Sequence, residues 1–375
     1  MPSGEFIGVL NSTRPKYMKG AADLTIRQRL LLALMRKKGR ILYNQSGDEC
    51  KWQVEFSQPP IEAYGDGGVI NFENHDAFRQ LSIDWRGYFG SDSISMKQTA
   101  MNSGDEALIK VFSTKQNRLM KSISNNFAGE IYKDGDATGR ANCIHGLETF
   151  MGVGTVAAGD KVAQPSDTYG LGSMSTALGN QGGTWSADLT GTDIPNATVA
   201  KDWPYGQGTS EFDFMSPKLF NWSSTSWGTG SSTLWEDNCW RVIGYAITAM
   251  ILGNGQEQMP DLLSLAGNLF QGYKNHNEVI RRIEVPHSAA DDLGFKGMTL
   301  NQDGVSIQPD FDCPVNTGYL VNVDQMTLMS LMPELFWMKG PTEDPRSAFS
   351  TVWATGFFGN IQWQPKFQAK LKNYA

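Results

Sequence analysis

One segment constrains the fold more than any other: residues 103–133, SGDEALIKVFSTKQNRLMKSISNNFAGEIYK. Ser103 and Glu106 have the spacing of a capping box, in which two side chains satisfy free backbone donors at a helix start. Apolar side chains then recur at helical spacing up to Asp134-Gly135: Leu108, Phe112, Leu119, Ile123, Phe127 and Ile131. A helix of about 28 residues would be ~42 Å long, well beyond the usual three turns. The pattern therefore predicts an elongated protein.

Residues 46–102 alternate between apolar and polar with the period of a β-strand. Two segments, CKWQVEF and QLSIDW, each place one apolar set on one face: Trp52, Val54 and Phe56, then Leu81, Ile83 and Trp85. The stretch between them, SQPPIEAYGDGGVINFENHD, is rich in Pro, Gly and acidic residues. A long hairpin with an elaborate tip is therefore predicted. Because such a hairpin is only marginally stable alone in water, it needs a surface, and a neighbouring subunit is one candidate.

The N-terminal 45 residues begin with a polar tail and continue as LTIRQRLLLALMRKKGRILYN. The spacing of Leu24, Leu31, Leu34 and Met35 predicts a short basic amphipathic helix that ends at Gly39. Two interpretations of its charged side stay open. It is either the solvated face of a packed helix or a positive arm that lies on an acidic partner, protein or nucleic acid.

The rest of the chain alternates between weakly and strongly patterned segments. Residues 140–232 are rich in Gly, Ser and Thr, which indicates loops and short strands. Two helices are predicted next, a buried one over TLWEDNCWRVIGYAITAMILGNG that stops at its final Gly, and one over MPDLLSLAGNLFQGYKNH, after Pro260. In the last forty residues Ile361 and Trp363 alternate with Asn360 and Gln362, so this part is expected to return to a sheet begun earlier in the chain.

Composition excludes several functions. The net charge of −7 and a pI near 5.2 argue against a protein that grips nucleic acid with a basic surface. The cysteines are widely spaced, without a CxxC pair, and the N-terminus lacks a secretion signal, so no disulfide framework is expected: Cys50, Cys143, Cys239 and Cys313. The longest apolar run, residues 242–252, is too short to span a bilayer. Charged residues are only 19% of the chain and Trp occurs eleven times, which suggests that much surface is covered by a partner.

Patterns that could carry chemistry are weak. DGDATGRANCIH has Asp134, Asp136 and Gly139 where a calcium loop has them, but His145 stands where the loop needs a bidentate Glu. We therefore expect a turn that ends the long helix. GVGTVAAG at 152–159 departs from the dinucleotide fingerprint, and His287 with Asp291 and Asp292 lacks a GxSxG nucleophile. No catalytic residue, cofactor or metal is expected.

The second half of the chain carries a resemblance to a known family. Three segments occur in order, PDLLSLAGNLFQGY, ADDLGFKGMTLNQDGVSIQPDFDCPVNTGYLVNVDQMTL and DPRSAFSTVWATGFFGNIQWQPKFQAKLKN, preceded by TYGLGSMSTA at 168–177. Together they resemble the major capsid proteins of tailed bacteriophages of the Hong Kong 97 type, which have the Johnson fold. Leu171 departs from the family, in which a second small residue is common at that position. The resemblance covers most of residues 45–370 and depends on the order of elements.

The resemblance implies an α+β fold of four parts. They are an N-terminal arm (1–45), an extended β-hairpin loop (46–102), a peripheral domain with a long spine helix (103–150 and 335–375) and an axial domain (151–334). In the family, the first of the quoted segments corresponds to a helix that begins with Pro-Asp-Leu. Asp312 and Pro314 would fix a turn between two axial strands, and Asn316 to Gly318 would make a tight reversal toward the capsomer axis. Cys313 would be a small buried residue.

The implied function is a major capsid (head) protein that self-assembles, through pentamers and hexamers, into the icosahedral shell around the double-stranded DNA of a tailed bacteriophage. Such a protein is not an enzyme, has no cofactor, and belongs to the virion after assembly in the host cytoplasm. Other copies of the chain are the main expected partners, with no membrane. A separate scaffolding protein is expected because no long charged coiled-coil leader is evident, and a portal and a decoration protein are further partners.

The expected contacts between subunits combine charge and aromatic burial. The acidic hairpin tip would suit a basic surface such as the N-terminal arm. The candidates are Arg27, Arg36, Lys37 and Lys38 in the N-terminal arm, and Trp52, Glu62, Asp66, Glu73, Asp76 and Trp85 in the hairpin. Some family members cross-link neighbours through a Lys in this loop. No Lys lies between Ser57 and Asp76, so a lattice without cross-links is predicted.

Two alternatives from other classes stay open. The first is a cellular, encapsulin-like shell protein with the same fold. The second is a glycan-binding β-rich protein, because aromatic side chains in a Gly/Ser-rich region can stack on sugars: Trp185, Trp203, Trp222 and Trp227. Packing within and between subunits is the competing explanation for these tryptophans, and no acidic pair there has the arrangement that cleavage requires.

Overall fold

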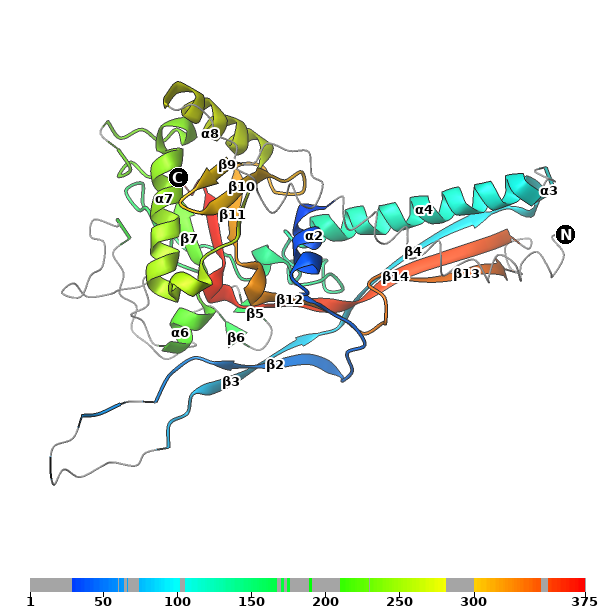
Figure 1. Ribbon diagram of the computed structural model, residues 1–375, viewed down its shortest axis with the longest axis horizontal. Helices are drawn as coiled ribbons and strands as arrows, with labels where there is room; N and C mark the ends of the chain where they lie inside the picture. The colour runs from blue at the N-terminus through cyan, green and yellow to red at the C-terminus, as the bar shows by residue number, and fades with distance from the viewer. Residues whose placement is uncertain are drawn as a thin grey trace.

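A computed structural model gives the architecture of the chain. It describes residues 29–59, 61–63, 66, 74–101, 105–166, 170–171, 174–175, 189–190, 210–228, 230–280, 300–344 and 350–374. Ser103, Trp185, Trp203 and the group His287, Asp291 and Asp292 lie outside these ranges. Figure 1 shows a body with two projections, a long arm on one side and a thin hairpin on the other. The chain is elongated, as the long helix predicts.

The body is built on a six-stranded sheet with the order β7-β15-β11-β8-β10-β9. The strands are β7 (Lys218–Asn221), β15 (Ala369–Lys372), β11 (Thr317–Val321), β8 (Leu262–Leu265), β10 (Val305–Pro309) and β9 (Leu300–Gln302). Helices α7 (Trp235–Asn254) and α8 (Gly267–Ile280) cover one face and share a buried apolar core with it. Gly255, at φ +90°, ends α7 as predicted. Smaller elements complete the body: α6 (Ser210–Met215), β5 (Gly170–Leu171), β6 (Met174–Ser175), η1 (Leu147–Thr149) and η2 (Gln256–Gln258).

The arm is a narrow sheet with one helix along it (Figure 1). Its central strand is β14 (Ser350–Trp363). The first part of β14 pairs with β13 (Trp337–Asp344) and the last part with β12 (Met326–Ser330). β4 (Arg86–Ile94) also pairs with β14, and the short α3 (Met96–Met101) follows it. Helix α4 (Asp105–Glu130) confirms the predicted long helix. It packs on one face of the sheet, where Phe127 and Phe357 have ring centroids 4.7 Å apart.

Two short segments pass between the sheets of the body and the arm. One is η4 (Val323–Gln325), between β11 and β12, and the other is η6 (Pro365–Phe367), between β14 and β15. The C-terminal residues thus return to a sheet begun earlier, as the alternation predicts. β15 lies in the body, so the expected 335–375 segment of the peripheral domain does not stay in the arm throughout. Conversely, β4 belongs to the arm rather than to the hairpin loop.

The N-terminal helix is shorter and more deeply packed than its sequence pattern suggests. α2 (Leu30–Lys37) buries every residue from Leu30 to Met35, and β1 (Ile41–Leu42) then pairs in parallel with β12. Gly39 ends the helix at φ +68°, a backbone conformation that favours glycine. Leu24 and Arg27 lie outside the described residues. Packing of the helix is thus observed for Leu30–Met35, while Arg36 and Lys37 at its end are exposed.

The predicted hairpin is present, and its apolar face is covered by its own chain. β2 (Glu49–Glu55) pairs antiparallel with β3 (Phe78–Asp84), and Trp52 stands opposite Leu81. The inward side chains belong to the main apolar core: Cys50, Trp52, Val54, Leu81 and Ile83. A neighbouring subunit is therefore not what covers this part of the hairpin. The hairpin is long enough to leave the body, but its root is fixed in the core.

Three expectations from the sequence are wrong in detail. Leu262–Leu265 is a strand rather than the start of a helix, because LLSL is buried on both faces between β10 and β11. Asn360, expected on a polar face, is buried, and its side chain donates to the carbonyl of Asp84 over 2.9 Å. In the 310–316 turn only Asn316 is left-handed, at φ +60°. Gly318 already lies in β11, where a Cβ would be 2.6 Å from Leu265.

Candidate functional site

Two features that the sequence offered for chemistry, the candidate calcium loop and the cysteines, lie in the described part of the chain. No group of His, Cys, Asp and Glu side chains among the described residues could hold a metal ion. The candidate calcium loop is the turn after α4, where Arg140 donates to the carbonyl of Asp134 over 2.7 Å. All four cysteines are free. Cys313 is buried as expected, and burial raises the pKa of its thiol far above the ordinary value. None of the described helices has the length and apolarity that a bilayer crossing requires.

The most distinctive surface lies on the arm, on the sheet face opposite α4. Phe357 packs on α4, so the alternation of a strand turns Phe358 to the other face. Phe89 and Trp337 both stand opposite Gly356 in the strand register and share that face. We call these three residues, Phe89, Trp337 and Phe358, the aromatic patch. Phe89 is 68% exposed and Phe358 39% exposed, a large apolar surface for a narrow arm.

Two glycines make the aromatic patch flat. A Cβ at Gly356 would lie 2.6 Å from the Trp337 ring, and one at Gly87 would lie 3.0 Å from Phe358. The rings therefore rest on bare backbone. Trp337 stacks on Phe358 with centroids 5.8 Å apart and an interplanar angle of 10°, and the Phe89 centroid is 6.3 Å from that of Trp337. The result is a fixed, water-facing apolar platform that suits a flat partner surface.

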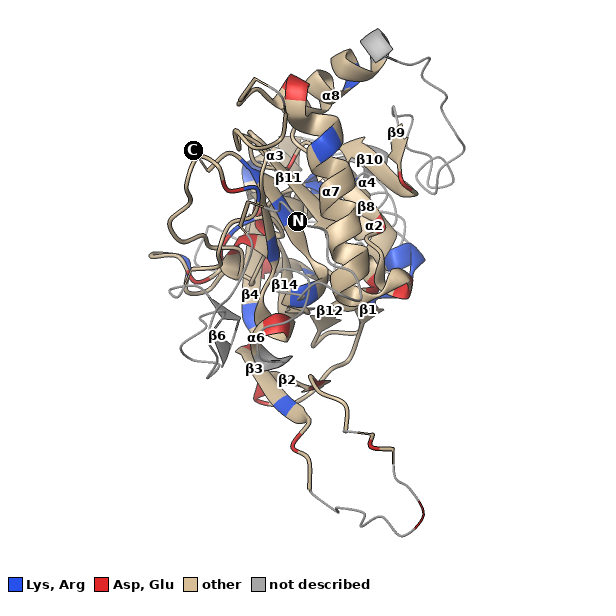
Figure 2. Ribbon diagram, turned by 90° about the vertical axis from the view of Figure 1, so that its left-hand side faces the viewer, with Lys and Arg blue, Asp and Glu red and all other residues tan. Residues whose placement is uncertain are grey.

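The contact residues expected from the sequence are spread over the molecule. Glu62, Asp66 and Asp76 are exposed on the hairpin, whose outer part carries acidic residues in Figure 2. Arg36 and Lys37 are exposed at the end of α2, whereas the Lys38 ammonium is bound within the chain, 2.7 Å from Asp261. Among the tryptophans, Trp52 is buried in the core and Trp85 is half-buried, with its indole donating to the carbonyl of Gly47. Arg27 and Glu73 lie outside the described residues.

Sequence reasoning missed the aromatic patch. Exposure alternates along β4, RGYFGSDSI, and Phe89 is the large apolar residue on the exposed side, next to Tyr88 on the other. The pattern for Phe358 is hidden because Phe357 and Phe358 are both apolar, so nothing in their order says which one packs on α4. Only the pairing of β14 with β4 and β13 decides that.

A group of polar residues lies at the root of the hairpin, where β3 passes into β4. The His145 side chain is buried, with Nδ1 3.5 Å from a carboxylate oxygen of Asp136. Arg86 lies 3.9 Å from the same oxygen and 4.0 Å from Asp84. The His145 backbone is fixed by Asn360 and by the indole of Trp363. Burial lowers the pKa of His145, and the nearby Asp136 opposes this effect without cancelling it.

This arrangement predicts that the subunit loses stability as the pH falls. Because the pKa of His145 is lowered in the folded state, the unfolded chain binds more protons below pH ~6.5. The contribution of His145 to the free energy of unfolding is therefore complete above that pH, and it is lost as the pH falls through the folded-state pKa. Urea unfolding at pH 7.5 and pH 5.5 measures it. His145→Phe, which cannot titrate, is expected to show a weaker pH dependence, and an unchanged dependence would contradict the prediction.

Comparison with known proteins identifies the fold. No protein-family model and no curated protein matches the sequence. Among solved structures, the chain matches the capsid of a native GTA particle with a TM-score of 0.55 at 10% identity, over 92% of this chain and 91% of that one. It also matches the Cyanophage A-1(L) capsid with a TM-score of 0.54 at 12% identity, over 92% of this chain and 93% of that one.

The chain has a capsid-protein fold. The likeness covers 92% of this chain in both comparisons. At such low identity it concerns the path of the backbone, while the aromatic patch and the hairpin root are features of this chain's own side chains.

Proposed function

We propose that the protein is the major capsid protein of a tailed bacteriophage, which self-assembles into an icosahedral shell around double-stranded DNA. The observation that carries this proposal is the capsid-protein fold over more than nine tenths of the chain. The two projections and the exposed aromatic patch support it, because such extended surfaces gain most when identical neighbours cover them. The acidic net charge of −7 suits a container that holds DNA without gripping it.

In finer terms, we propose a Johnson-type organisation. Residues 1–45 form the N-terminal arm and the hairpin within 46–102 is the extended loop. The long arm of Figure 1, which is distinct from the N-terminal arm, has α4 as its spine helix. It corresponds to the peripheral domain, expected over 103–150 and 335–375, with β4 added and β15 removed. The body corresponds to the axial domain, expected over 151–334, with β15 added and β12 assigned to the arm. In this scheme the 310–316 turn belongs to the axial domain.

The proposed subunit contacts are of two kinds. The exposed acidic residues of the hairpin, Glu62, Asp66 and Asp76, would face basic residues of a neighbour such as Arg36 and Lys37. The aromatic patch would be buried under an adjacent copy. Arg27 and Glu73 stay candidates on sequence alone. We further propose a lattice without isopeptide cross-links, since residues 58–75 contain no Lys; covalent ladders of the subunit in mass spectrometry would contradict this.

The proposed partners follow from the same role. They are other copies of this chain in pentamers and hexamers, a separate scaffolding protein, a portal and, where one exists, a decoration protein. Assembly would take place in the host cytoplasm and end in the virion. Neither alternative gains support from a specific observation. Trp222 and Trp227 are buried, with Trp222 packed edge-on against Trp235, so these two are not placed to stack on a sugar.

Size-exclusion chromatography and negative-stain electron microscopy of the purified protein, with and without a crowding agent, test the proposal. Shells, tubes or rings of five and six subunits are expected. Phe89→Ser is expected to abolish them while the monomer stays folded, because the exposed ring contributes mainly to contacts between copies. Phe89→Leu is the matched control and keeps an apolar surface, so it should still assemble. A monomer under every condition would count against the proposed function, and normal assembly of Phe89→Ser would count against the proposed role of the patch.

A further inference from the structure

The body and the arm are joined by two short connections that lie side by side. The first, residues 322–325, leads from β11 to β12, and the second, residues 364–368, leads from β14 to β15. The two are linked by a reciprocal pair of hydrogen bonds. The Gln368 amide donates to the carbonyl of Asn322 and accepts from the Asn322 backbone N–H, both over 3.1 Å.

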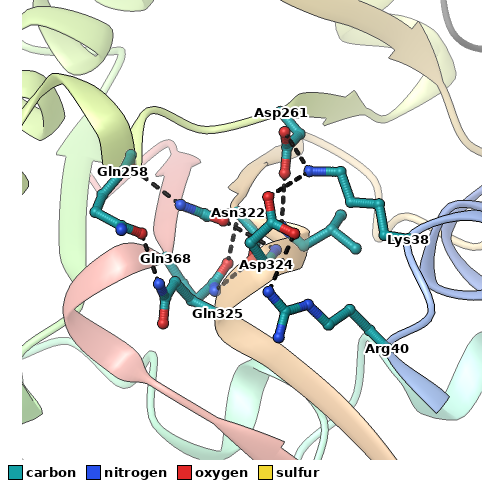
Figure 3. Close-up of polar contacts among 9 residues, drawn as sticks. Lys38, Arg40, Gln258, Asp261, Asn322, Asp324, Gln325 and Gln368 are labelled. Carbon is teal, nitrogen blue, oxygen red and sulfur yellow. Dashed lines mark hydrogen bonds and ion pairs between the residues drawn. The ribbon is translucent and has the colours of Figure 1, made fainter.

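Neutral side chains link the two connections to each other and to the body. We call Gln258, Asn322, Gln325 and Gln368 the amide cluster (Figure 3). The Asn322 amide donates to the carbonyl of Gln258 over 3.1 Å, and the Gln325 amide donates to the Gln258 side chain over 2.6 Å. Gln368 and Asn322 are almost fully buried, at 0% and 2% exposure. Gln258 and Gln325 are half-buried. The hydrogen bonds among these neutral side chains do not depend on salt, because the cluster contains no charge to screen.

A charged group of residues lies beside the amide cluster and is partly open to water. We call Lys38, Arg40, Asp261 and Asp324 the ionic bridge (Figure 3). The Lys38 ammonium lies 2.7 Å from Asp261 and 2.6 Å from Asp324, and Arg40 lies 3.3 Å from the other oxygen of Asp324. These side chains are between 28% and 46% exposed. Water and salt therefore reach the ion pairs.

The ionic bridge connects the two sheets through the N-terminal segment. Arg40 accepts a backbone hydrogen bond from Leu328 of β12, and Ile41 pairs with the same strand, so residues 40–42 are fixed to the arm sheet. Asp261 directly precedes β8 of the body sheet, and its second oxygen accepts from the backbone N–H of Val323 over 2.9 Å. Lys38 thus binds Asp261 of the body and Asp324 of the first connection. Its own segment is anchored on the arm through residues 40–42.

We propose that the ionic bridge is a salt-sensitive latch that fixes the angle between body and arm, and that the amide cluster is the pivot about which this angle changes. The contrast between neutral amides and partly exposed charges carries the inference, because salt screens only the charges. The biological role of this latch, unlike its existence, rests on the proposed function. A shell with both pentamers and hexamers places one chain in surroundings of different curvature, which different angles between body and arm would accommodate.

The charges predict how the latch responds to pH. Burial acts to raise the pKa of Asp324, but Lys38 and Arg40 outweigh it and hold the pKa below the ordinary value. Burial acts to lower the pKa of Lys38, but Asp261 and Asp324 outweigh it and raise the pKa. The bridge is therefore intact between these limits. It opens as the pH falls through the lowered pKa of Asp324 or rises through the raised pKa of Lys38.

Distances between spin labels on the isolated full chain test the latch. One label is placed at Thr248→Cys on α7 and the other at Lys121→Cys on α4, both exposed positions, in a chain with Cys143→Ser. The protein is expected to give one narrow distance population at low salt. Lys38→Met, or about 1 M NaCl, where the Debye length is only ~3 Å, is expected to add a second population. Asp261→Asn should do the same, because it keeps an acceptor for Val323 and loses the charge.

A matched control removes a comparable surface pair elsewhere. Lys51→Met breaks the exposed pair with Glu49, 3.3 Å apart on β2, and is expected to leave the distance population single. Circular dichroism verifies that each variant is folded. A single, unchanged population in Lys38→Met, in Asp261→Asn and at high salt would overturn the proposal. Because the measurement uses unassembled subunits, failure to form shells would refute the proposed function without deciding the latch.

Discussion

Lys370→Met is expected to lower the free energy of unfolding by about 3 kcal/mol, the lower end of the range for breaking a buried ion pair. Lys370 is 3% exposed on β15, and its ammonium lies 2.6 Å from Glu148. The other oxygen of Glu148 accepts from the Tyr319 hydroxyl of β11. Without Lys370 the carboxylate keeps its charge with less compensation. The effect stays at the lower end because the Glu148 side chain is 24% exposed.

Urea unfolding of a double-mutant cycle measures this ion pair. Burial lowers the pKa of Lys370 even though Glu148 opposes the shift, so the desolvation of the ammonium outweighs the attraction. Lys370→Met/Glu148→Gln is therefore expected to lose much less stability than Lys370→Met alone, because Gln keeps an acceptor for Tyr319 without a charge. Lys372→Met, two residues along on the same strand and exposed, is the control and should change little. Equal losses in the single and double variants would contradict the interpretation.

Phe357→Ala is expected to lower the free energy of unfolding by about 4 kcal/mol, the cost of an unfilled cavity in a well-packed core. Phe357 is fully buried on β14 and packs edge-on against Phe127 of α4 and against Phe336. These three rings hold the spine helix to the sheet of the arm. Their loss should therefore weaken the attachment of α4 more than the far side of the body, where α7 and α8 pack on the six-stranded sheet in a separate core.

Hydrogen exchange distinguishes local from global loss in this variant. Amides of α4 and β4 are expected to exchange faster in Phe357→Ala, while those of α7 and β8 change less. Phe358→Ala is the matched control, since the neighbouring ring is 39% exposed and faces away from α4. It should cost much less stability, and in an assembly assay it should weaken contacts between copies. Equal losses for both variants would mean that the two faces of β14 are not as different as their packing indicates.

Local patterns predicted the elements whose stability comes from a single face. The stripe from Phe112 to Ile131 predicted α4, and the alternation around Trp52 and Leu81 predicted the pairing of β2 with β3. Gly255 and Gly39 ended their helices where expected because each has a positive φ. In all these cases the residues near each other in sequence carry the periodicity that burial on one side requires.

Elements buried on both sides escaped prediction. Leu262–Leu265 resembled the beginning of a helix, since a short apolar run has no periodicity to separate strand from helix. Its strand pairs with β10 and β11, which lie about fifty residues further along the chain. The candidate surfaces behave similarly. The acidic hairpin residues were visible in sequence, whereas the aromatic patch depended on which of Phe357 and Phe358 packs on α4.

The amino-acid sequence by itself determined the long helix, the hairpin, the basic end of α2 and an order of segments typical of capsid proteins. These features are local, because they follow from spacing and from turn residues. Tertiary structure alone decided that the root of the hairpin packs on its own chain, that Lys38 joins Asp261 to Asp324, and that Phe358 faces outward. Each of these depends on side chains brought together by strand pairing over long sequence distances, which no local periodicity encodes.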